Sequence, residues 1–374
     1  IRAFSREEHE KERFKDANTE LMETQLYTGR MMAWMMPIMM LIMNCITVAI
    51  VWFGAKGISA GHMQVGDMMA FITYAMVIVM SFLLLTMMSI MLPRAGVAAE
   101  RIQEVIGTRS SITDAEQLAD DEMGDIRGEL AFHNVSFAYP NAKDNVLDGL
   151  DFEAEPGKTT AIIGSTGCGK TTLLDMIPRL ADVTEGTVFV DGMDVRKLLR
   201  HELDQAIGMV PQKAFLFSGT LEDNPRDGKP DARQEELWEA LSIAQAKEFV
   251  EKNERGLKMK ISEGGTNFSG GQRQRLAIAR AIVRRPSIYL FDDSFSALDY
   301  RTDQELRRAL KPVTQNAAVI IVAQRISTIK DADQILVMNQ GRIEAVGTHE
   351  ELMQSSRTYQ EIVASQPTDK EVAS

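Results

Sequence analysis

A glycine-rich segment followed by Lys and Thr carries the clearest chemistry in the sequence. The segment GSTGCGKT, residues 164–171, fits the pattern G-x-x-x-x-G-K-[ST] and lies between the strand-like TTAIIG and the helical TLLDMIP. Its glycines let the backbone turn so that successive N–H groups face one anion, and the following helix N-terminus adds partial positive charge. In such a loop Lys170 reaches the β and γ phosphates of a nucleotide, and the Thr171 hydroxyl binds Mg²⁺. The predicted nucleotide contacts are Gly164, Ser165, Thr166, Gly167, Cys168, Gly169, Lys170, Thr171 and Thr172.

Two further segments narrow this nucleotide chemistry. SIYLFDD is an apolar run that ends in Asp292, where a carboxylate at a strand end can hold Mg²⁺ through water. In NFSGGQRQRLAIARA, residues 267–281, Ser269 and two glycines open a helix and offer a second set of N–H donors for a γ phosphate. Alone, the first segment would be read as a buried strand ending in a solvated acid. Together with the phosphate loop, both indicate an ATP site.

These motifs resemble those of the ATP-binding cassette (ABC) family, whose LSGGQ-type signature stands here as FSGGQ, residues 268–272. The resemblance implies that the signature contacts ATP held by an opposite subunit. It implies that Tyr139, otherwise an ordinary strand aromatic, stacks on adenine, and that Gln212 contacts Mg²⁺ and senses the membrane domain. Asp299, which ends SALD, matches the loop that crosses to the partner. The signature residues concerned are Ser269, Gly270, Gly271 and Gln272.

The sequence departs from the family at two neighbouring catalytic positions. Asp293 stands where the family has the Glu that positions the attacking water, and Gln324 in VAQRIST stands where the family has His. Asp is one methylene shorter, and a displacement of about 1 Å at a reacting centre can cost on the order of a hundredfold in rate. Gln can donate a hydrogen bond to a γ phosphate but has no titratable imidazole. We therefore expect ATP to bind well and turn over slowly. Catalysis is assigned to Lys170, Asp293 and Gln324, and Mg²⁺ to Thr171, Gln212 and Asp292.

Two apolar runs precede these motifs, and each is long enough to cross a bilayer as a helix. Residues 31–53 and 68–92 contain no charged side chain. Basic residues are concentrated in residues 1–30 and after the second run, whereas the loop between the runs has only Lys56, so both ends are predicted to be cytoplasmic. The alternative is a pair of buried core helices in a soluble domain. Residues 1–30 are predicted to form an intracellular helix, although a plain solvated helix has the same charge pattern.

The rest of the chain has an α/β pattern. After an acidic connector, residues 107–127, the apolar runs TAIIG, TVFV, IGMVP, SIYLF and AVIIVA alternate with helical stretches. This alternation predicts a largely parallel sheet. The predicted organisation is a partial transmembrane domain at 1–106, the connector, a nucleotide-binding domain at 128–365 and a tail at 366–374.

Composition excludes several other functions. A net charge of −12 argues against nucleic acid as a partner, because a phosphate-binding surface needs excess Lys and Arg. Cys45 and Cys168 cannot form a disulfide framework. Five histidines without ligand spacing give no support for a metal-dependent peptidase.

The resemblance implies the last two helices of a six-helix exporter domain joined to an ABC ATPase domain, with earlier spans missing from the chain. The favoured hypothesis is a subunit of a heterodimeric exporter in the cytoplasmic membrane, with its ATPase domain in the cytoplasm. Its cofactors are ATP and Mg²⁺. Its expected partners are a second exporter half, membrane lipid and a hydrophobic or amphipathic small molecule. Alternatives are a homodimeric exporter in which Asp293 works as the base, a regulatory ATP-binding subunit, and a soluble mechanochemical ATPase of the DNA-repair type.

Overall fold

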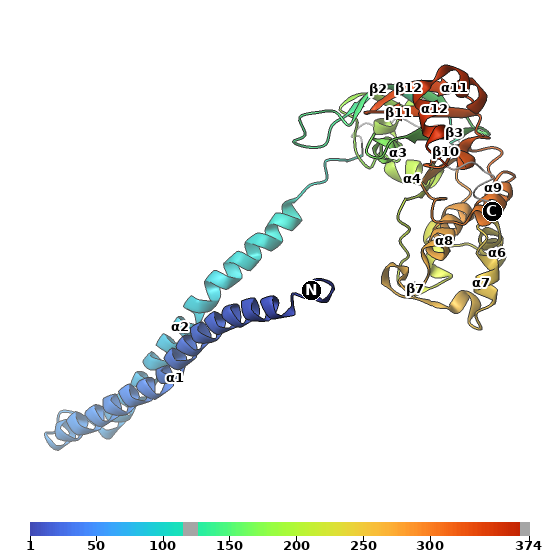
Figure 1. Cartoon of the computed structure of the whole chain (residues 1–374). Helices are drawn as coiled ribbons and strands as arrows, with labels where there is room; N and C mark the ends of the chain where they lie inside the picture. The colour runs from blue at the N-terminus through green and yellow to red at the C-terminus, as the bar shows by residue number, and fades with distance from the viewer. Residues whose placement is uncertain (115–125, 367–374) are drawn as a thin grey trace. The chain divides into compact units, whose positions relative to one another are not determined.

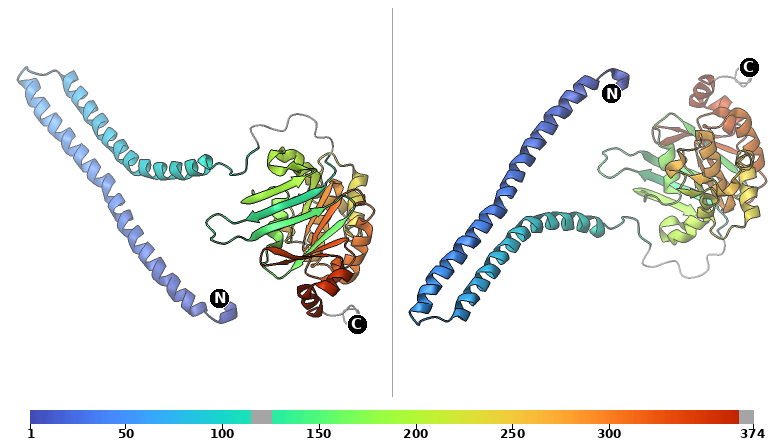
Figure 2. Two further views of the ribbon diagram at one scale, coloured as in Figure 1. Left: turned by 90° about the horizontal axis from the view of Figure 1, so that it is seen from above. Right: turned by 90° about the horizontal axis from the view of Figure 1, so that it is seen from below.

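The computed structural model describes residues 1–114 and 126–366 (Figures 1 and 2). It divides into two compact units, Ile1–Arg109 and Ser110–Ser374. Much of the predicted connector at 107–127, and all of the predicted tail except Gln366, therefore lie outside the described residues.

The first unit is a pair of long helices. A short turn, η1 (Arg2–Phe4), is followed by Ser5 with φ of 49°, so α1 (Glu7–Ser59) begins at Glu7. The predicted intracellular helix and the first apolar run thus form one unbroken helix. The change from polar to apolar side chains alters what surrounds a helix, but it does not end one, because charged and apolar residues have similar helix propensities. The second helix is α2 (Val65–Gly107), whose first turn is capped by a bond from the Gln64 N–H to Asp67 Oδ2 at 3.0 Å.

Both helices are apolar enough to cross a membrane and leave their apolar side chains uncovered within this unit. Their most apolar 18-residue windows have mean hydropathies of 2.2 and 2.5, and 6% and 0% of these windows is buried. The helices lie side by side near the loop that joins them (Figure 2), where Gly54 packs against Met68. A side chain at residue 54 would place its Cβ 3.0 Å from Met68 Cγ, so glycine permits this close approach. A core helix of a soluble domain would be mostly buried, and these are not.

The second unit is built on a six-stranded sheet. All neighbouring strands are parallel except β11 and β12. Each of the five residues in β9 and β10 is buried, as expected for central strands covered on both faces. The order across the sheet is β12 (Arg342–Gly347), β11 (Gln334–Asn339), β3 (Thr159–Gly164), β10 (Ala318–Val322), β9 (Ile288–Asp292) and β6 (Ile207–Val210).

A separate antiparallel sheet holds one of the runs assigned from sequence to the parallel sheet. Its order is β2 (Leu147–Ala154), β1 (Leu130–Phe137), β4 (Glu185–Val190) and β5 (Met193–Asp194). TVFV lies in β4, so its predicted place in the parallel sheet is wrong. The strand alternates between buried and partly exposed residues in its second half, which is the pattern of a strand with one covered face. The inner face packs through stacked rings of Phe132 and Phe152, 4.5 Å apart.

Alternate residues of the parallel strands fill two hydrophobic cores. Ile162, Leu290 and Ile320 join the core shared with the antiparallel sheet, whereas Ile163 and Ile321 join the core on the other face. Helices that surround these cores are α3 (Lys170–Met176), α4 (Arg200–Ala206), α5 (Asp223–Gly228), α6 (Gln234–Ile243), α7 (Lys247–Glu251), α8 (Gly270–Val283), α9 (Tyr300–Leu310), α10 (Ile326–Ile329), α11 (His349–Ser355) and α12 (Arg357–Ala364). The short elements are β7 (Gly219–Thr220), β8 (Lys260–Ile261), η2 (Val195–Lys197), η3 (Gly256–Lys258) and η4 (Glu263–Gly265).

Candidate functional site

Four parallel strands end at one edge of the sheet, and the predicted catalytic residues follow them. Val322 of β10 pairs with Ile162 of β3 and with Asp292 of β9, and Val210 of β6 pairs with Phe291. The loops after these strands therefore start at nearly the same level, where ligands of open α/β sheets bind. They carry the phosphate loop, Asp292 and Asp293, Gln324, and Gln212, which are far apart in the sequence.

The phosphate loop depends on glycine for its shape and for its close packing. Gly167 and Gly169 have φ of 84° and 100°, in the left-handed region that favours glycine. A Cβ on Gly169 would lie 2.9 Å from Leu147 Cδ2, and a Cβ on Gly164 would collide with the Met338 carbonyl. Cys168 is 4% exposed and fills space beneath the loop, as a small filler residue would.

Lys170 holds its charge over the loop without a carboxylate partner among the described residues. Its Nζ donates to the carbonyls of Gly164 at 2.9 Å and Ser165 at 2.8 Å. Hydrogen bonds to neutral carbonyls leave the ammonium without a carboxylate in direct contact, so it can turn to a phosphate, which accepts stronger charge-assisted bonds.

Asp292 and Thr171 form a pair of oxygen ligands suited to Mg²⁺. The Thr171 hydroxyl donates to Asp292 Oδ2 at 2.9 Å. Burial raises the pKa of Asp292, which is 3% exposed, while the Thr171 bond and the Lys170 charge act in the opposite direction. Over the described chain no group of three or more His, Cys, Asp or Glu could hold a metal by itself. The Thr171 and Asp292 oxygens fit Mg²⁺, which binds through one or two protein oxygens together with phosphates and water.

Asp293 is held by two glutamine amides. Gln324 Nε2 lies 2.8 Å from Asp293 Oδ2, and Gln212 Nε2 lies 3.4 Å from the same oxygen. The backbone of Asp293 has φ of 45° and its N–H donates to the Val322 carbonyl at 2.9 Å. Burial raises the pKa of this carboxyl, and hydrogen bonds and the Lys170 charge oppose the rise. Three residues predicted from separate motifs thus meet at one carboxylate oxygen.

Tyr139 and Thr172 lie beside the phosphate loop. The Tyr139 hydroxyl is 3.2 Å from Thr172 Oγ1, and the tyrosine ring meets Phe137 edge-on with centroids 5.0 Å apart. Tyr139 is 49% exposed, which leaves ring surface available for stacking.

The signature and Asp299 form a second group. Ser269 caps α8 by accepting a bond from the Gln272 N–H at 3.3 Å, and Gln272 Oε1 accepts from the Ser269 N–H at 3.0 Å. A Cβ on Gly271 would lie 3.2 Å from the Ala297 carbonyl, so the signature borders the segment that ends in Asp299, the N-cap of α9. Within residues 1–114 and 126–366, no hydrogen bond joins this group to the phosphate loop.

Three polar residues that the sequence analysis did not select connect these groups. Gln274 lies on α8 and is 3% exposed. It donates at 3.3 Å to the carbonyl of Pro211, the residue directly before Gln212. Arg325 donates to the carbonyls of Leu298 at 3.4 Å and Ser296 at 3.2 Å. Ser296 Oγ donates to the Asp293 carbonyl at 2.8 Å. All three lie inside or next to quoted motifs. The partners of Gln274 and Arg325 are distant in sequence, so the pattern gave no signal for them, whereas the partner of Ser296 is only three residues away.

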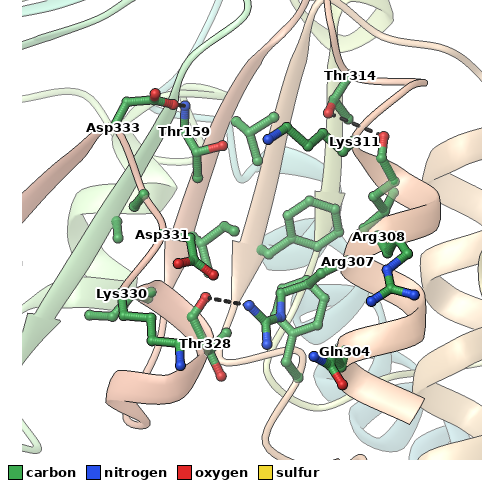
Figure 3. Close-up of a pocket in the computed structure, with 18 of the residues that line it drawn as sticks. Thr159, Gln304, Arg307, Arg308, Lys311, Thr314, Thr328, Lys330, Asp331 and Asp333 are labelled. Carbon is green, nitrogen blue, oxygen red and sulfur yellow. Dashed lines mark hydrogen bonds between the residues drawn. The ribbon is translucent and has the colours of Figure 1, made fainter. Parts of the chain in front are cut away.

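A cavity of about 500 Å³ lies apart from this site, on the face of the sheet covered by α9. Figure 3 shows Arg307 reaching across it to the Thr328 carbonyl, a bond of 3.3 Å. Its lining contains neither phosphate-loop residues nor Asp293, so the cavity is not the nucleotide site.

Two family models match the chain and together cover more than half of it. The ABC transporter transmembrane region matches residues 1–82, and the ABC transporter family matches residues 147–296. The chain belongs to the ABC transporter family, and it joins a transmembrane region to an ATPase domain in one polypeptide. It is a membrane protein with its ATPase domain in the cytoplasm.

Within that family the chain is similar to several bacterial proteins. An uncharacterised ABC transporter ATP-binding protein of Mycobacterium tuberculosis is 47% identical over 98% of this chain and 63% of that protein. An ATP-dependent lipid A-core flippase of Chromobacterium violaceum is 34% identical over 96% of this chain and 61% of the flippase. The structure of a bacterial Atm1-family ABC exporter with ATP bound matches this chain with a TM-score of 0.85 and 30% sequence identity. The match covers 99% of this chain and 65% of that one.

These comparisons confirm the predicted fold class, a helical transmembrane segment followed by an α/β ATPase domain of the ABC type. The chain spans less than two thirds of the length of these relatives.

Proposed function

We propose that this chain is part of an ABC exporter subunit whose own ATP site hydrolyses slowly and whose signature completes the site of a partner subunit. The observation that carries the proposal is the pairing of Asp293 Oδ2 with the amides of Gln324 and Gln212. In this arrangement a shortened carboxylate and an amide stand where the family has Glu and His.

Nucleotide binding in this proposal uses residues that the chain retains. The phosphate-loop N–H groups and Lys170 hold the phosphates, and Asp292 and Thr171 hold Mg²⁺ beside them. When bound, Mg²⁺ neutralises charge on the β and γ oxygens. Binding is therefore expected to be close to normal.

Hydrolysis is the step in which the site is weak. Water must attack the γ phosphorus while the bond to the bridging β–γ oxygen breaks, and a carboxylate orients that water and takes its proton. Asp293 Oδ2 already accepts a bond from Gln324 at 2.8 Å, which occupies acceptor capacity that the water would use. Gln324 can donate to the γ phosphate, but its amide does not titrate near neutral pH as an imidazole would.

The signature supports the second half of the proposal. Ser269 and Gln272 cap α8 reciprocally, and the first turn of this 14-residue helix presents N–H groups next to the segment that ends in Asp299. An ATP held by a partner's phosphate loop would meet this intact surface. We infer that the partner supplies the Glu and His that this chain lacks.

The transported compound is proposed to be hydrophobic or amphipathic. Large apolar side chains of α1 and α2, many of them Met, are exposed in this unit, and Met adapts to ligands of different shape. Similarity to a lipid A-core flippase favours a lipid-like compound.

The test is ATP hydrolysis by the full-length protein in lipid nanodiscs, purified alone and co-expressed with the half-transporter encoded nearest to it in the genome. We expect negligible turnover alone and robust turnover together. Lys170→Ala in each preparation measures the background. Robust turnover by the protein alone would refute the proposal and make Asp293 the working base of a homodimer.

A further inference from the structure

Gln366, the last described residue, bonds to the loop that carries Gln324. We call residues 323–325, between β10 and α10, the switch loop. Gln366 Nε2 donates to the Gln324 carbonyl at 2.7 Å, and Gln366 Oε1 accepts from the Ile326 N–H at 2.8 Å. One side-chain amide therefore pairs with the backbone on both sides of Arg325, as a neighbouring strand would.

This contact supplies a helix cap that the local sequence does not provide. Helix α10 starts at Ile326, and its N-cap residue, Arg325, makes no side-chain capping bond. The first N–H groups of a helix have no partner within the helix, so a side-chain oxygen usually accepts from them. Gln366 takes that role from 40 residues away.

The switch loop is connected to the catalytic carboxylate on its other side. Gln324 bonds to Asp293 through its side chain and to Gln366 through its carbonyl. Arg325 reaches the carbonyls of Leu298 and Ser296, in the segment that ends in Asp299. A shift of the switch loop would therefore move Gln324 and loosen Arg325 together.

Gln366 joins the end of α12 to the start of α10, and other contacts hold each of these two helices in place. Tyr359 of α12 is fully buried and its hydroxyl lies 2.8 Å from His349 Nδ1, while the Gln366 N–H donates to Val363 at the end of the same helix. The far side of α10 is held by Arg307, which pairs with the buried Asp303 (Figure 3 shows its bond to Thr328).

We propose that Gln366 is a positioning residue for Gln324, and that it sets how firmly this site retains the γ phosphate. The inference rests on the proposed contact between Gln324 and the γ phosphate, which distinguishes ATP from ADP. Removing the Gln366 amide should weaken the hold on ATP and leave the hold on ADP, which lacks that phosphate, unchanged.

The experiment uses the full-length protein in its assembled transporter and photolabelling with radioactive 8-azido-ATP or 8-azido-ADP in Mg²⁺. Label that remains on this chain after a timed wash gives a retention half-life for its own site. We expect Gln366→Ala to shorten ATP retention about threefold to tenfold, the effect of losing one or two ordinary hydrogen bonds, with ADP retention unchanged.

The matched control is Gln360→Ala. Gln360 is an exposed residue on α12, the helix that precedes Gln366. Its side-chain amide also bonds to a backbone carbonyl, that of Met353 at 2.7 Å, away from the switch loop. We expect it to retain both nucleotides like the wild type. Equal retention by the two variants would overturn the proposal, and so would a parallel loss of ATP and ADP, which indicates general loosening of the domain.

A double-mutant cycle separates this proposal from the proposed function. If Gln366 acts through Gln324, Gln366→Ala should have little further effect on ATP retention in a Gln324→Ala background. If Gln324→Ala itself leaves ATP retention unchanged, the proposed role of Gln324 is wrong and this inference is overturned with it. If Gln324→Ala shortens retention and Gln366→Ala does not, only the role of Gln366 is wrong.

Discussion

Lengthening the carboxylate at residue 293 tests the reason given for slow hydrolysis. Asp293→Glu extends the side chain by one carbon–carbon bond, about 1.5 Å. Since about 1 Å at a reacting centre is worth on the order of a hundredfold, the gain could reach about 2.7 kcal/mol. Asp293 has φ of 45°, and Glu adopts this left-handed region less readily than Asp, at about 1 kcal/mol; this cost lowers the stability of the fold and does not change the barrier, because the backbone is the same in the ground and transition states. We therefore expect turnover at this site to rise about tenfold or more.

The assay is phosphate release by the full-length protein at saturating Mg²⁺-ATP, with Asp293→Asn as the control. Asn keeps the size of the side chain and an oxygen that can accept from Gln324, but it cannot serve as a base, so it should abolish the residual activity. Melting curves establish that each variant is folded. If Asp293→Glu is no faster than the wild type, the length of the carboxylate does not limit the site, and Gln324 becomes the cause to examine.

Three further predictions concern the described contacts. Burial raises the pKa of the Asp292 carboxyl in the folded protein. Its contribution to stability is therefore fully present below the pKa of the unfolded chain and is lost as the pH rises through the folded pKa. Asp292→Asn should raise the Tm of the nucleotide-free protein at pH 7, by an amount that shrinks toward pH 4, and an unchanged Tm at pH 7 would contradict this reasoning. Gly186→Ala should destabilise the domain by about 3 kcal/mol in urea unfolding, because its Cβ would collide with the Asn134 carbonyl; Gly192→Ala, with a similar φ of 76° and open space, should cost only about 1 kcal/mol, and equal costs would exclude the collision as the cause. Tyr139→Ala should weaken binding of a fluorescent ATP analogue about tenfold whereas Tyr139→Phe should change it less than threefold, since stacking needs only the ring; equal losses would point to the hydroxyl instead.

The phosphate loop could be read from sequence because its requirements are local. Gly164 to Thr171 are contiguous, and their spacing between an apolar run and a helix pattern is enough to fix a strand, a turn and a helix. The membrane-spanning helices were predictable for the same reason, since absence of charge over a long run is a property of the run itself. The family resemblance added the signature, whose serine and glutamine do cap α8.

The sheet to which a strand belongs could not be read in the same way. TVFV has the composition of a buried strand, and only the pairing of β4 with β1 shows that it lies in the antiparallel sheet. A short apolar run indicates that the strand is buried, but the strand with which it pairs depends on the rest of the fold.

Sequence determined which residues could bind a nucleotide, and the tertiary structure decided how they act on one another. Asp293 and Gln324 were each selected from their own motif, but the 2.8 Å bond between them exists because β9 and β10 are adjacent and in register. The contact of Gln366 with the switch loop had no sequence signal, because a single Gln is unremarkable until the backbone it bonds to is known. Local patterns specify helices, turns and charge, whereas hydrogen bonds between distant segments depend on how strands and helices pack.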